Sequence, residues 1–414
     1  MDKDIIYTHP IRRAGLRRMR LILALCLLDV VPAILVILAY LGISLPQLVN
    51  ITQLFIFFGI ATLTRSLTLR SLPFLMFAIT LLAISGLKSI FNFDYEDINF
   101  DASAVFPYLY SLVMPPIIFS SIYSQKNATG REILQELRWF SKWFVIVSFP
   151  IMGAYIALHY TGRIAYFGFG INFPYAAPYF FHRTGFVVLF ITIILLSGKR
   201  AVLVNFIIQW VIYSIGELRR SPIKMIFLLC LAILFIISAL PYLEFFLRRF
   251  FLMTSVWSNS GSGFDFLSMS GSYESVAMFS GRLEEIAGVI SYYKQHPAQF
   301  WFGSPPGANF LWEIDYAGYT EFKSYAHLTW AGYVFRFGAV PTSLLLVTLI
   351  AKLVAGWDAK NPLFLVYVAI LSGATFGGNL FYSPVPWAMI ALYFRYGKAI
   401  SQEIRHECHG SAKP

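Results

Sequence analysis

Charged side chains are scarce in this sequence of 414 residues. Asp, Glu, Lys and Arg make up 13% of the chain, whereas hydrophobic residues make up 58%. A soluble globular protein is charged at about a quarter of its positions, so the composition excludes an ordinary cytosolic enzyme. Cysteine is also rare, and Cys26, Cys230 and Cys408 predict neither a disulfide framework nor a metal site. The sequence contains no P-loop or dinucleotide-binding fingerprint, and we expect no cofactor.

Long apolar runs take the place of the missing charge. A bilayer core of about 30 Å needs roughly 20 apolar residues per helix, and an aromatic content of 18% suits helices that face lipid. One apolar stretch, Phe169–Ser197, is interrupted by two prolines and by the pair His182-Arg183. The other candidate spans are Leu21–Ile43, Gln47–Leu63, Leu72–Ile90, Ser103–Tyr123, Trp143–Tyr160, Leu203–Gly216, Ile223–Tyr242, Ala339–Val354, Leu363–Phe381 and Pro384–Arg395.

The basic residues predict the topology. The net charge is +11, but Lys and Arg occur in short clusters between the apolar runs, which is typical of a membrane protein and argues against a nucleic-acid partner. The arginines between residues 12 and 20 predict a cytoplasmic N-terminus, and the basic tail 398–414 predicts a cytoplasmic C-terminus. Both ends on the inside require an even number of spans.

The interrupted stretch decides that number. If Phe169–Ser197 forms two short spans that turn at His182-Arg183, the chain has about twelve spans, and Lys199 and Arg200 lie outside. The alternative is one span with these two residues in the cytoplasm, which leaves an odd number of spans. We favour the first interpretation. It predicts an all-α polytopic transmembrane helical bundle, with about nine spans in residues 1–242, a large, partly helical periplasmic loop in 243–338, further spans in 339–397, and a cytoplasmic tail in 398–414.

The predicted loop 243–338 is the most polar part of the chain, and long structured loops are usually functional. Within it, residues 282–294 predict a helix. The apolar face of this helix would consist of Leu283, Ile286, Ile290 and Tyr293. The turn-rich segment that follows contains Gly303, Gly307 and Asn309. Its backbone N–H groups could contact phosphate or sugar, although a simple tight turn is equally consistent with these residues.

Several cationic side chains fall on the predicted outer side, against the usual preference of Lys and Arg for the cytoplasm. Arginine suits phosphate because its planar fork donates two parallel hydrogen bonds and keeps its charge. His327 stands where the loop leads into a span, and a neutral imidazole can take a proton from a hydroxyl group. The alternative is an interfacial histidine bonded to a neighbour. The outer cations are Arg163, Lys199, Arg200, Arg248, Arg249, Arg282, Lys323 and Arg336.

The order of these elements resembles the O-antigen polymerase/ligase family, the multi-pass glycosyltransferases that use polyprenyl-pyrophosphate-linked glycans. The resemblance covers roughly residues 185–350, and elsewhere only the hydropathy pattern is similar. The matching features, in chain order, are Ser197-Gly-Lys-Arg200 at the start of an inward span, the arginine-led helix at Arg282, the turn from Pro297 through Gly303 and Gly307 to Phe310, and His327 followed eleven residues on by Gly338.

The resemblance implies a site and its partners. Arg200 and Arg282 would bind the pyrophosphate, and His327 would orient the acceptor hydroxyl or take its proton, without a metal ion and with inversion at the anomeric carbon. Donor and acceptor would be undecaprenyl-pyrophosphate-linked oligosaccharides in the bacterial inner membrane, and a chain-length-regulating co-polymerase is a candidate partner. The further substrate-binding residues would be Lys199, Arg163, Arg336, Gly303, Gly307 and Asn309.

We therefore expect a polymerase that transfers a growing glycan from its lipid carrier to a new lipid-linked repeat unit. Ligase-type members of the family often carry Asn after the histidine, whereas this chain has Leu328, which favours a polymerase over a ligase that joins the glycan to lipid A-core. A flippase or transporter of lipid-linked glycans is the alternative from another class. Twelve spans suit a transporter, but the polar residues gather in one outer loop instead of along a central path.

Overall fold

The apolar runs of the sequence form helices, and the described part of the chain is mostly helical. The structure is a computed structural model that describes residues 10–43, 45, 47–64, 80, 102–125, 128–161, 173–197, 200–218, 282–314, 319–323, 326, 329–376 and 383–410. In this part the helical fold class is confirmed, with one departure from an all-α fold, a two-stranded antiparallel sheet.

The first apolar run forms two helices instead of one. α1 (Pro10–Leu27) and α2 (Val31–Tyr40) are separated by a single 3-10 turn, η1 (Leu28–Val30), which contains Asp29. Pro32 lies in the first turn of α2, where the missing N–H of proline removes no helical hydrogen bond. An acidic residue and a proline thus mark the point where the long run changes its helical geometry.

The next helices largely follow the predicted runs: α3 (Gln47–Leu63), α5 (Ala102–Tyr123) and α6 (Gly130–Tyr160). α6 begins well before its predicted apolar part because a capping box starts it. The Thr129 N–H donates to Glu132 Oε2 at 3.0 Å, and the Glu132 N–H donates to Thr129 Oγ1 at 3.4 Å. The predicted spans 72–90 and 223–242 lie outside the described residues.

The interrupted stretch 169–197 contains one helix. Its described first part forms two 3-10 turns, η4 (Phe173–Tyr175) and η5 (Ala177–Phe180), where the prediction had a short span. After the turn at His182-Arg183 comes α7 (Thr184–Ser197). Proline at two of the eight positions from 173 to 180 limits the regular i→i−4 hydrogen bonds, which accounts for the 3-10 turns.

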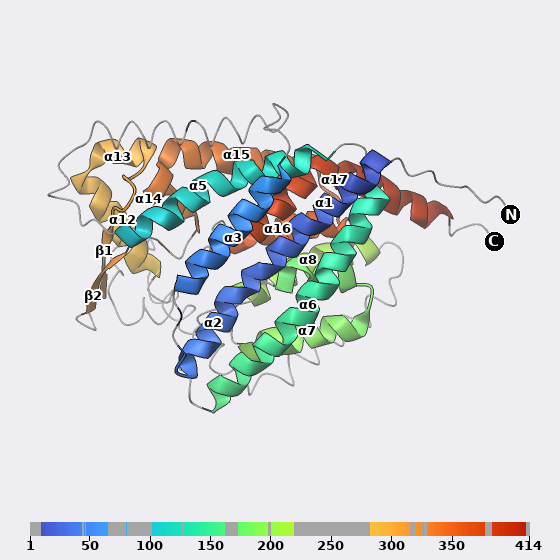
Figure 1. Cartoon of the computed structure of the whole chain (residues 1–414), viewed down its shortest axis with the longest axis horizontal. Helices are drawn as coiled ribbons and strands as arrows, with labels where there is room; N and C mark the ends of the chain where they lie inside the picture. Colours follow the sequence, from blue (N-terminus) through green and yellow to red (C-terminus); the bar gives the residue numbers. More distant parts are fainter. Residues whose placement is uncertain are drawn as a thin grey trace, which may run out of the picture.

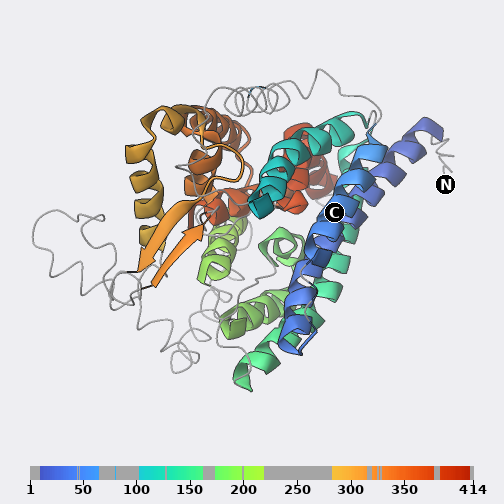
Figure 2. The same ribbon diagram turned by 60° about the vertical axis from the view of Figure 1, so that its left-hand side comes forward.

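The remaining elements are α8 (Arg200–Leu218), α12 (Arg282–Gln295), α13 (Pro297–Phe302), β1 (Phe310–Ile314), β2 (Tyr319–Lys323), α14 (Thr329–Phe337), α15 (Ala339–Ala355), α16 (Pro362–Phe376) and α17 (Pro384–Gly410). β1 and β2 pair antiparallel, with Phe310 opposite Lys323 and Ile314 opposite Tyr319. The described residues from Arg282 to Phe337 are called the α12–α14 unit below. They lie together at one side of the molecule (Figures 1 and 2).

Two helices of the described part are long and apolar enough to cross a membrane, Ala14–Tyr40 and Gly130–Leu158. Large apolar side chains also point outward along other helices. Phe55 on α3 is 61% exposed, and Val347 and Val354 on α15 are 63% and 71% exposed. A water-soluble protein rarely exposes such side chains in rows. The structure therefore indicates association with a membrane. The twelve spans and the predicted division into 1–242, 243–338, 339–397 and 398–414 remain predictions.

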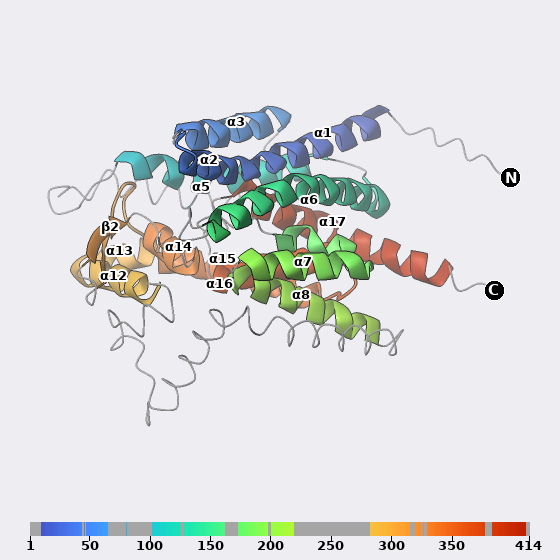
Figure 3. The ribbon, with the colours of Figure 1, turned by 90° about the horizontal axis from the view of Figure 1, so that it is seen from below.

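The helix ends sort into two groups (Figures 1 and 3). Both termini lie on one side of the molecule, and the α12–α14 unit lies on the other. On the side of the termini, Gly130 at the start of α6 packs on the backbone of Ala399 in α17. There too, the Asn361 side chain donates to the Gly397 carbonyl oxygen at 2.9 Å. The start of α6, the connection before α16 and the second half of α17 thus lie near one another.

Candidate functional site

The α12–α14 unit has a hydrophobic core of its own. Buried side chains of α12, β1 and α14 form it, among them Val289, Tyr292, Phe310 and Phe335. α12 packs closely on β1 because it has glycine at position 288, where a Cβ would lie 2.3 Å from the Leu311 carbonyl oxygen. Two tyrosines of α12 add hydrogen bonds, which fix the helix to the elements around it.

Tyr292 and Tyr293 stay neutral in this core. The Tyr293 hydroxyl is 2.6 Å from the carbonyl oxygen of Val334 and 2.9 Å from that of Phe335, and the Tyr292 hydroxyl donates to Gln299 Oε1 at 2.6 Å. Burial raises the pKa of both phenols above the ordinary value, because the phenolate form would lose its hydration. Both hydroxyls therefore act as hydrogen-bond donors throughout the physiological pH range.

The helix at Arg282 is confirmed. On its predicted apolar face Tyr293 is buried, while Ile286 and Ile290 are half-buried. The two acids of its first turn, Glu284 and Glu285, are each 2% exposed. Lys323 Nζ on β2 lies 3.2 Å from Glu285 Oε1.

Lys323 is also in contact with an aromatic ring. Its Nζ atom lies 3.2 Å from the centroid of the Trp312 ring on β1. The lysine is thus held between a carboxylate and an indole face, two groups that attract a cation. This contact joins the hairpin to the first turn of α12, the turn that Arg282 begins.

Two glycines fix the unit against the start of α15. Gly303 has φ 91° and Gly338 has φ 88°, and both backbones are in a region that side-chain-bearing residues avoid. They also approach each other. A Cβ on Gly303 would lie 2.2 Å from the Arg336 carbonyl oxygen, and one on Gly338 would lie 2.4 Å from the Gly303 nitrogen. The Ser304 N–H donates to the Phe335 carbonyl oxygen at 2.8 Å beside them.

Besides Gly303, three more of the predicted substrate-binding residues lie in this region. Arg336, in the last turn of α14, is 3% exposed, so a substrate would not reach its side chain from solvent in this arrangement. Gly307 has φ 86° in the turn before β1. The Asn309 side chain is half-buried, and its Oδ1 atom is buried with no hydrogen-bond partner among the described residues. The loop is therefore packed into the unit, and its polar atoms are largely covered.

The predicted catalytic residues are placed only by their backbones or their neighbours. Arg200 is the first residue of α8 and Arg282 the first of α12. Their side chains are not part of the described structure, and His327 lies outside the described residues, as do Lys199 and Arg163. The described neighbours of His327, Ala326 and Thr329, are both fully buried. No described contact joins the three predicted catalytic side chains.

Hydrogen bonds along α16 place two of these positions at the same end of the bundle. Ser372 Oγ donates to Asn205 Oδ1 at 2.9 Å, which sets the first turns of α8 beside the last turns of α16. Trp330 Nε1, in the first turn of α14, donates to Thr375 Oγ1 at 3.3 Å. Residue 200 and the start of α14 are thus both held at the C-terminal end of α16. The other end of α8 packs by Gly216 against Ala359, on the side of the termini.

Sequence reasoning missed Glu284 and Glu285 as buried groups. Acids in the first turn of a helix are expected on the exposed surface, because the helix dipole alone favours them there. The sequence gives no signal that Glu284 and Glu285 are buried. Lys323 stands thirty-eight residues after Glu285, and only the pairing of β1 with β2 brings it to α12.

Chemically, the α12–α14 unit combines a helix start at Arg282, a buried acid pair and a rigid glycine junction, and the helix start at Arg200 lies at the same end of α16 as the start of α14. Among the described residues, no group of three or more His, Cys, Asp or Glu side chains is arranged to hold a metal ion. Helix N-terminal ends favour anions, because their first N–H groups are unpaired and the helix dipole is positive there. This end of the bundle therefore suits a negatively charged ligand. No match to this chain was found among protein-family models, curated proteins or solved structures.

Proposed function

We propose that this protein is a membrane glycosyltransferase that polymerises lipid-pyrophosphate-linked repeat units on the outer side of the bacterial inner membrane. The observation that supports it best is the grouping along α16. The helix start at Arg200 and the start of α14, which follows His327, are held at the same end of one helix by Asn205–Ser372 and Trp330–Thr375. A pyrophosphate and an acceptor hydroxyl have to meet at one such place.

The proposed reaction needs positioning and charge stabilisation. The acceptor hydroxyl oxygen forms a bond to the anomeric carbon of the donor sugar, and the bond from that carbon to the pyrophosphate oxygen breaks. The electron pair leaves with the lipid pyrophosphate. Arg200 and Arg282 bind this diphosphate as its charge grows, and His327 accepts the proton of the hydroxyl. The Lys323–Glu285 pair holds the first turn of α12, which Arg282 begins.

The test is elongation of lipid-linked repeat units by the purified full chain in detergent, without any gradient. Arg282→Ala should abolish elongation, and Arg282→Lys should restore little, because lysine lacks the planar fork. Lys294→Ala is the matched control, since Lys294 is an exposed cation in the last turn of the same helix. Wild-type product lengths from Arg282→Ala would refute the assignment of this residue.

His327→Ala tests the proton acceptor. It should lower turnover severely while leaving donor binding near the wild-type value, because the imidazole acts on the acceptor hydroxyl. Turnover close to wild type would demote His327 to a structural residue. A cysteine placed at position 200 should be labelled from outside by an impermeant reagent, and labelling only after membrane disruption would contradict the topology.

A transporter of lipid-linked glycans is the second candidate, and one observation favours it. The first long apolar run changes from α-helix to a 3-10 turn at η1, where Asp29 accepts a hydrogen bond of 2.6 Å from Ser383 Oγ just before α17. An ionisable residue inside a membrane helix is typical of transporter pathways. The elongation assay separates the two functions. Longer products exclude a pure transporter, whereas binding of lipid-linked units without elongation, together with loss of flipping in Asp29→Asn, would favour it.

A further inference from the structure

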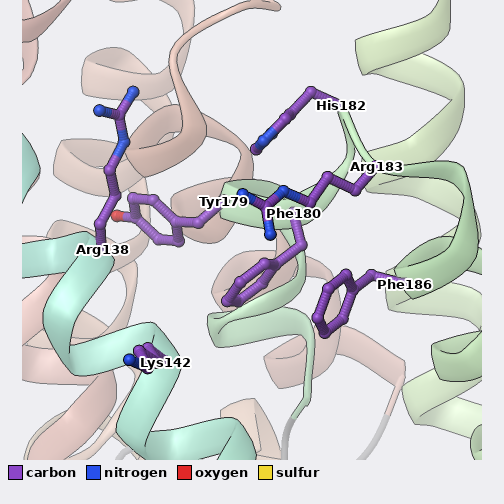
Figure 4. A pocket seen from close by; sticks show the side chains of 7 residues that line it. All are labelled: Arg138, Lys142, Tyr179, Phe180, His182, Arg183 and Phe186. Atoms are coloured by element: carbon purple, nitrogen blue, oxygen red, sulfur yellow. The ribbon is translucent and has the colours of Figure 1, made fainter.

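A cavity of about 570 Å³ lies between α6 and the turn that joins η5 to α7 (Figure 4). Four of its lining side chains are basic or imidazole groups, and the other three are aromatic. They are Arg138, Lys142, His182 and Arg183, together with Tyr179, Phe180 and Phe186. The cavity is thus rich in cationic groups and contains no carboxylate among these lining residues.

The cavity lies on the side of the termini and away from the α12–α14 unit. Arg138 and Lys142 are one turn apart on α6 and therefore share a face of that helix. They lie in the half of α6 that begins at Gly130, which packs on α17. Lys142 is followed by Trp143, 43% exposed, where the apolar part of α6 begins. Tryptophan is typical of the boundary between lipid and water, so the cavity lies at the expected depth of lipid head groups.

The Tyr179 hydroxyl is an independent sign of a ligand. Tyr179 is 6% exposed, and its hydroxyl oxygen is buried without a hydrogen-bond partner among the described residues. In Figure 4 the hydroxyl points toward α6, beside Arg138, and the two groups interact electrostatically. A buried donor of this kind is rare in native proteins unless something else satisfies it. An acceptor oxygen in the cavity would do so.

The cations and the aromatic wall together select the ligand. Two arginines and a lysine match the oxygens of a phosphate group, for which the arginine fork is well shaped. Phe180 and Phe186 stack with ring centroids 5.0 Å apart and form an apolar side of the cavity. A free phosphate ion would gain nothing from these rings, whereas the chain of a lipid would cover them.

We propose that this cavity binds the phosphate group of an anionic membrane lipid. The arginines and Lys142 hold the phosphate oxygens, the Tyr179 hydroxyl donates to one of them, and the Phe180–Phe186 pair contacts the start of the lipid chain. The proposal does not depend on glycosyl transfer, because the cavity lies at the opposite end of the bundle from the α12–α14 unit.

Native mass spectrometry of the full chain in neutral detergent tests this directly. The protein is titrated with dioleoyl phosphatidylglycerol and, separately, with dioleoyl phosphatidylcholine, and the first bound lipid is quantified. The anionic lipid should bind tighter by at least about tenfold, because phosphatidylcholine offers the same phosphate but adds a quaternary ammonium that the arginines and Lys142 repel. Arg138→Gln/Arg183→Gln should remove most of this preference, and Tyr179→Phe should weaken binding several-fold with the preference kept.

Arg131→Gln is the matched control. Arg131 is an exposed arginine in the first turn of the same helix and does not line the cavity. It should leave the preference unchanged. Equal loss in Arg131→Gln and in the double variant would show general attraction by surface charge and overturn the proposal, as would an unchanged preference in the double variant. Displacement of the lipid by millimolar inorganic phosphate or pyrophosphate would assign the cavity to a soluble anion instead. Because all the substituted arginines are exposed, helical content by circular dichroism should stay at the wild-type level.

Discussion

Replacing Gly303 with alanine should loosen the junction between the α12–α14 unit and α15. The backbone at this position has φ 91° and ψ 170°, a region open essentially to glycine, and the strain of placing another residue there costs about 1–3 kcal/mol. The added Cβ would also lie 2.2 Å from the Arg336 carbonyl oxygen, more than an ångström closer than an ordinary contact. Overpacking of this kind costs about 1–3 kcal/mol more.

A combined cost of about 3 kcal/mol corresponds to roughly a hundredfold change in a local opening equilibrium. Hydrogen–deuterium exchange of the solubilised protein should therefore be about a hundredfold faster for amides of α13 and α14. Exchange in α16 and α17 should change little, because neither helix contains Gly303 or Gly338. Elongation activity should fall in parallel, since α14 follows the segment that contains His327.

Two other glycines separate the contributions. Gly42 has φ 88° but no atom within 4 Å of its added Cβ, so Gly42→Ala reports the backbone strain alone. Gly153 is helical with open space around it, and Gly153→Ala should be neutral or slightly stabilising. If Gly303→Ala exchanged no faster than Gly153→Ala, the close approach of the two glycine backbones would not be a real constraint.

Three further predictions concern other contacts. Lys323→Met should destabilise the α12–α14 unit by about 3–5 kcal/mol, because it removes a cation that pairs with the buried Glu285 carboxylate. Adding Glu285→Gln should recover part of the loss. Thermal unfolding of both variants, beside the exposed control Lys294→Met, measures this, and equal stability of the single and control variants would contradict it. Above about pH 10 the Tyr293 phenol ionises in the unfolded chain, whereas its raised pKa keeps it neutral in the folded protein, so stability should fall as pH rises. Tyr293→Phe should therefore show a shallower fall in melting temperature between pH 9 and 11. Parallel melting curves of wild type and variant over this range would count against it. Gln209→Leu should lower the free energy of unfolding by about 1–2 kcal/mol, since the Gln209 amide donates to the carbonyl oxygens of Pro174 and Leu365 at 2.8 and 2.9 Å. Wild-type thermal stability and unchanged protease resistance around residues 173–180 would show that these bonds do not hold the two 3-10 turns.

The sequence by itself determined most helices, since a long apolar run has few alternatives to a helix when lipid surrounds it. The run 47–63 and the start of α15 at Ala339 have the predicted bounds, and α5 differs by one residue. The helix at Arg282 was also predictable from its periodicity. Residues 219–281 lie outside the described part, so the span predicted at 223–242 stays a prediction.

Tertiary structure decided the rest, because the decisive partners are far apart in the chain. Nothing local to β1 indicated a strand; its partner β2 supplies the hydrogen bonds, and the pairing places Lys323 on Glu285. The burial of Glu285 on α12 followed from that contact and not from the apolar pattern of the helix. Gly303 and Gly338 each looked like an ordinary turn residue. Only packing showed that a side chain on Gly303 would meet the backbone of Arg336 and that one on Gly338 would meet the backbone of Gly303. Apolar periodicity indicates which face of a segment contacts lipid or the protein core. Ion pairs and close backbone contacts depend instead on which segments become neighbours in the fold.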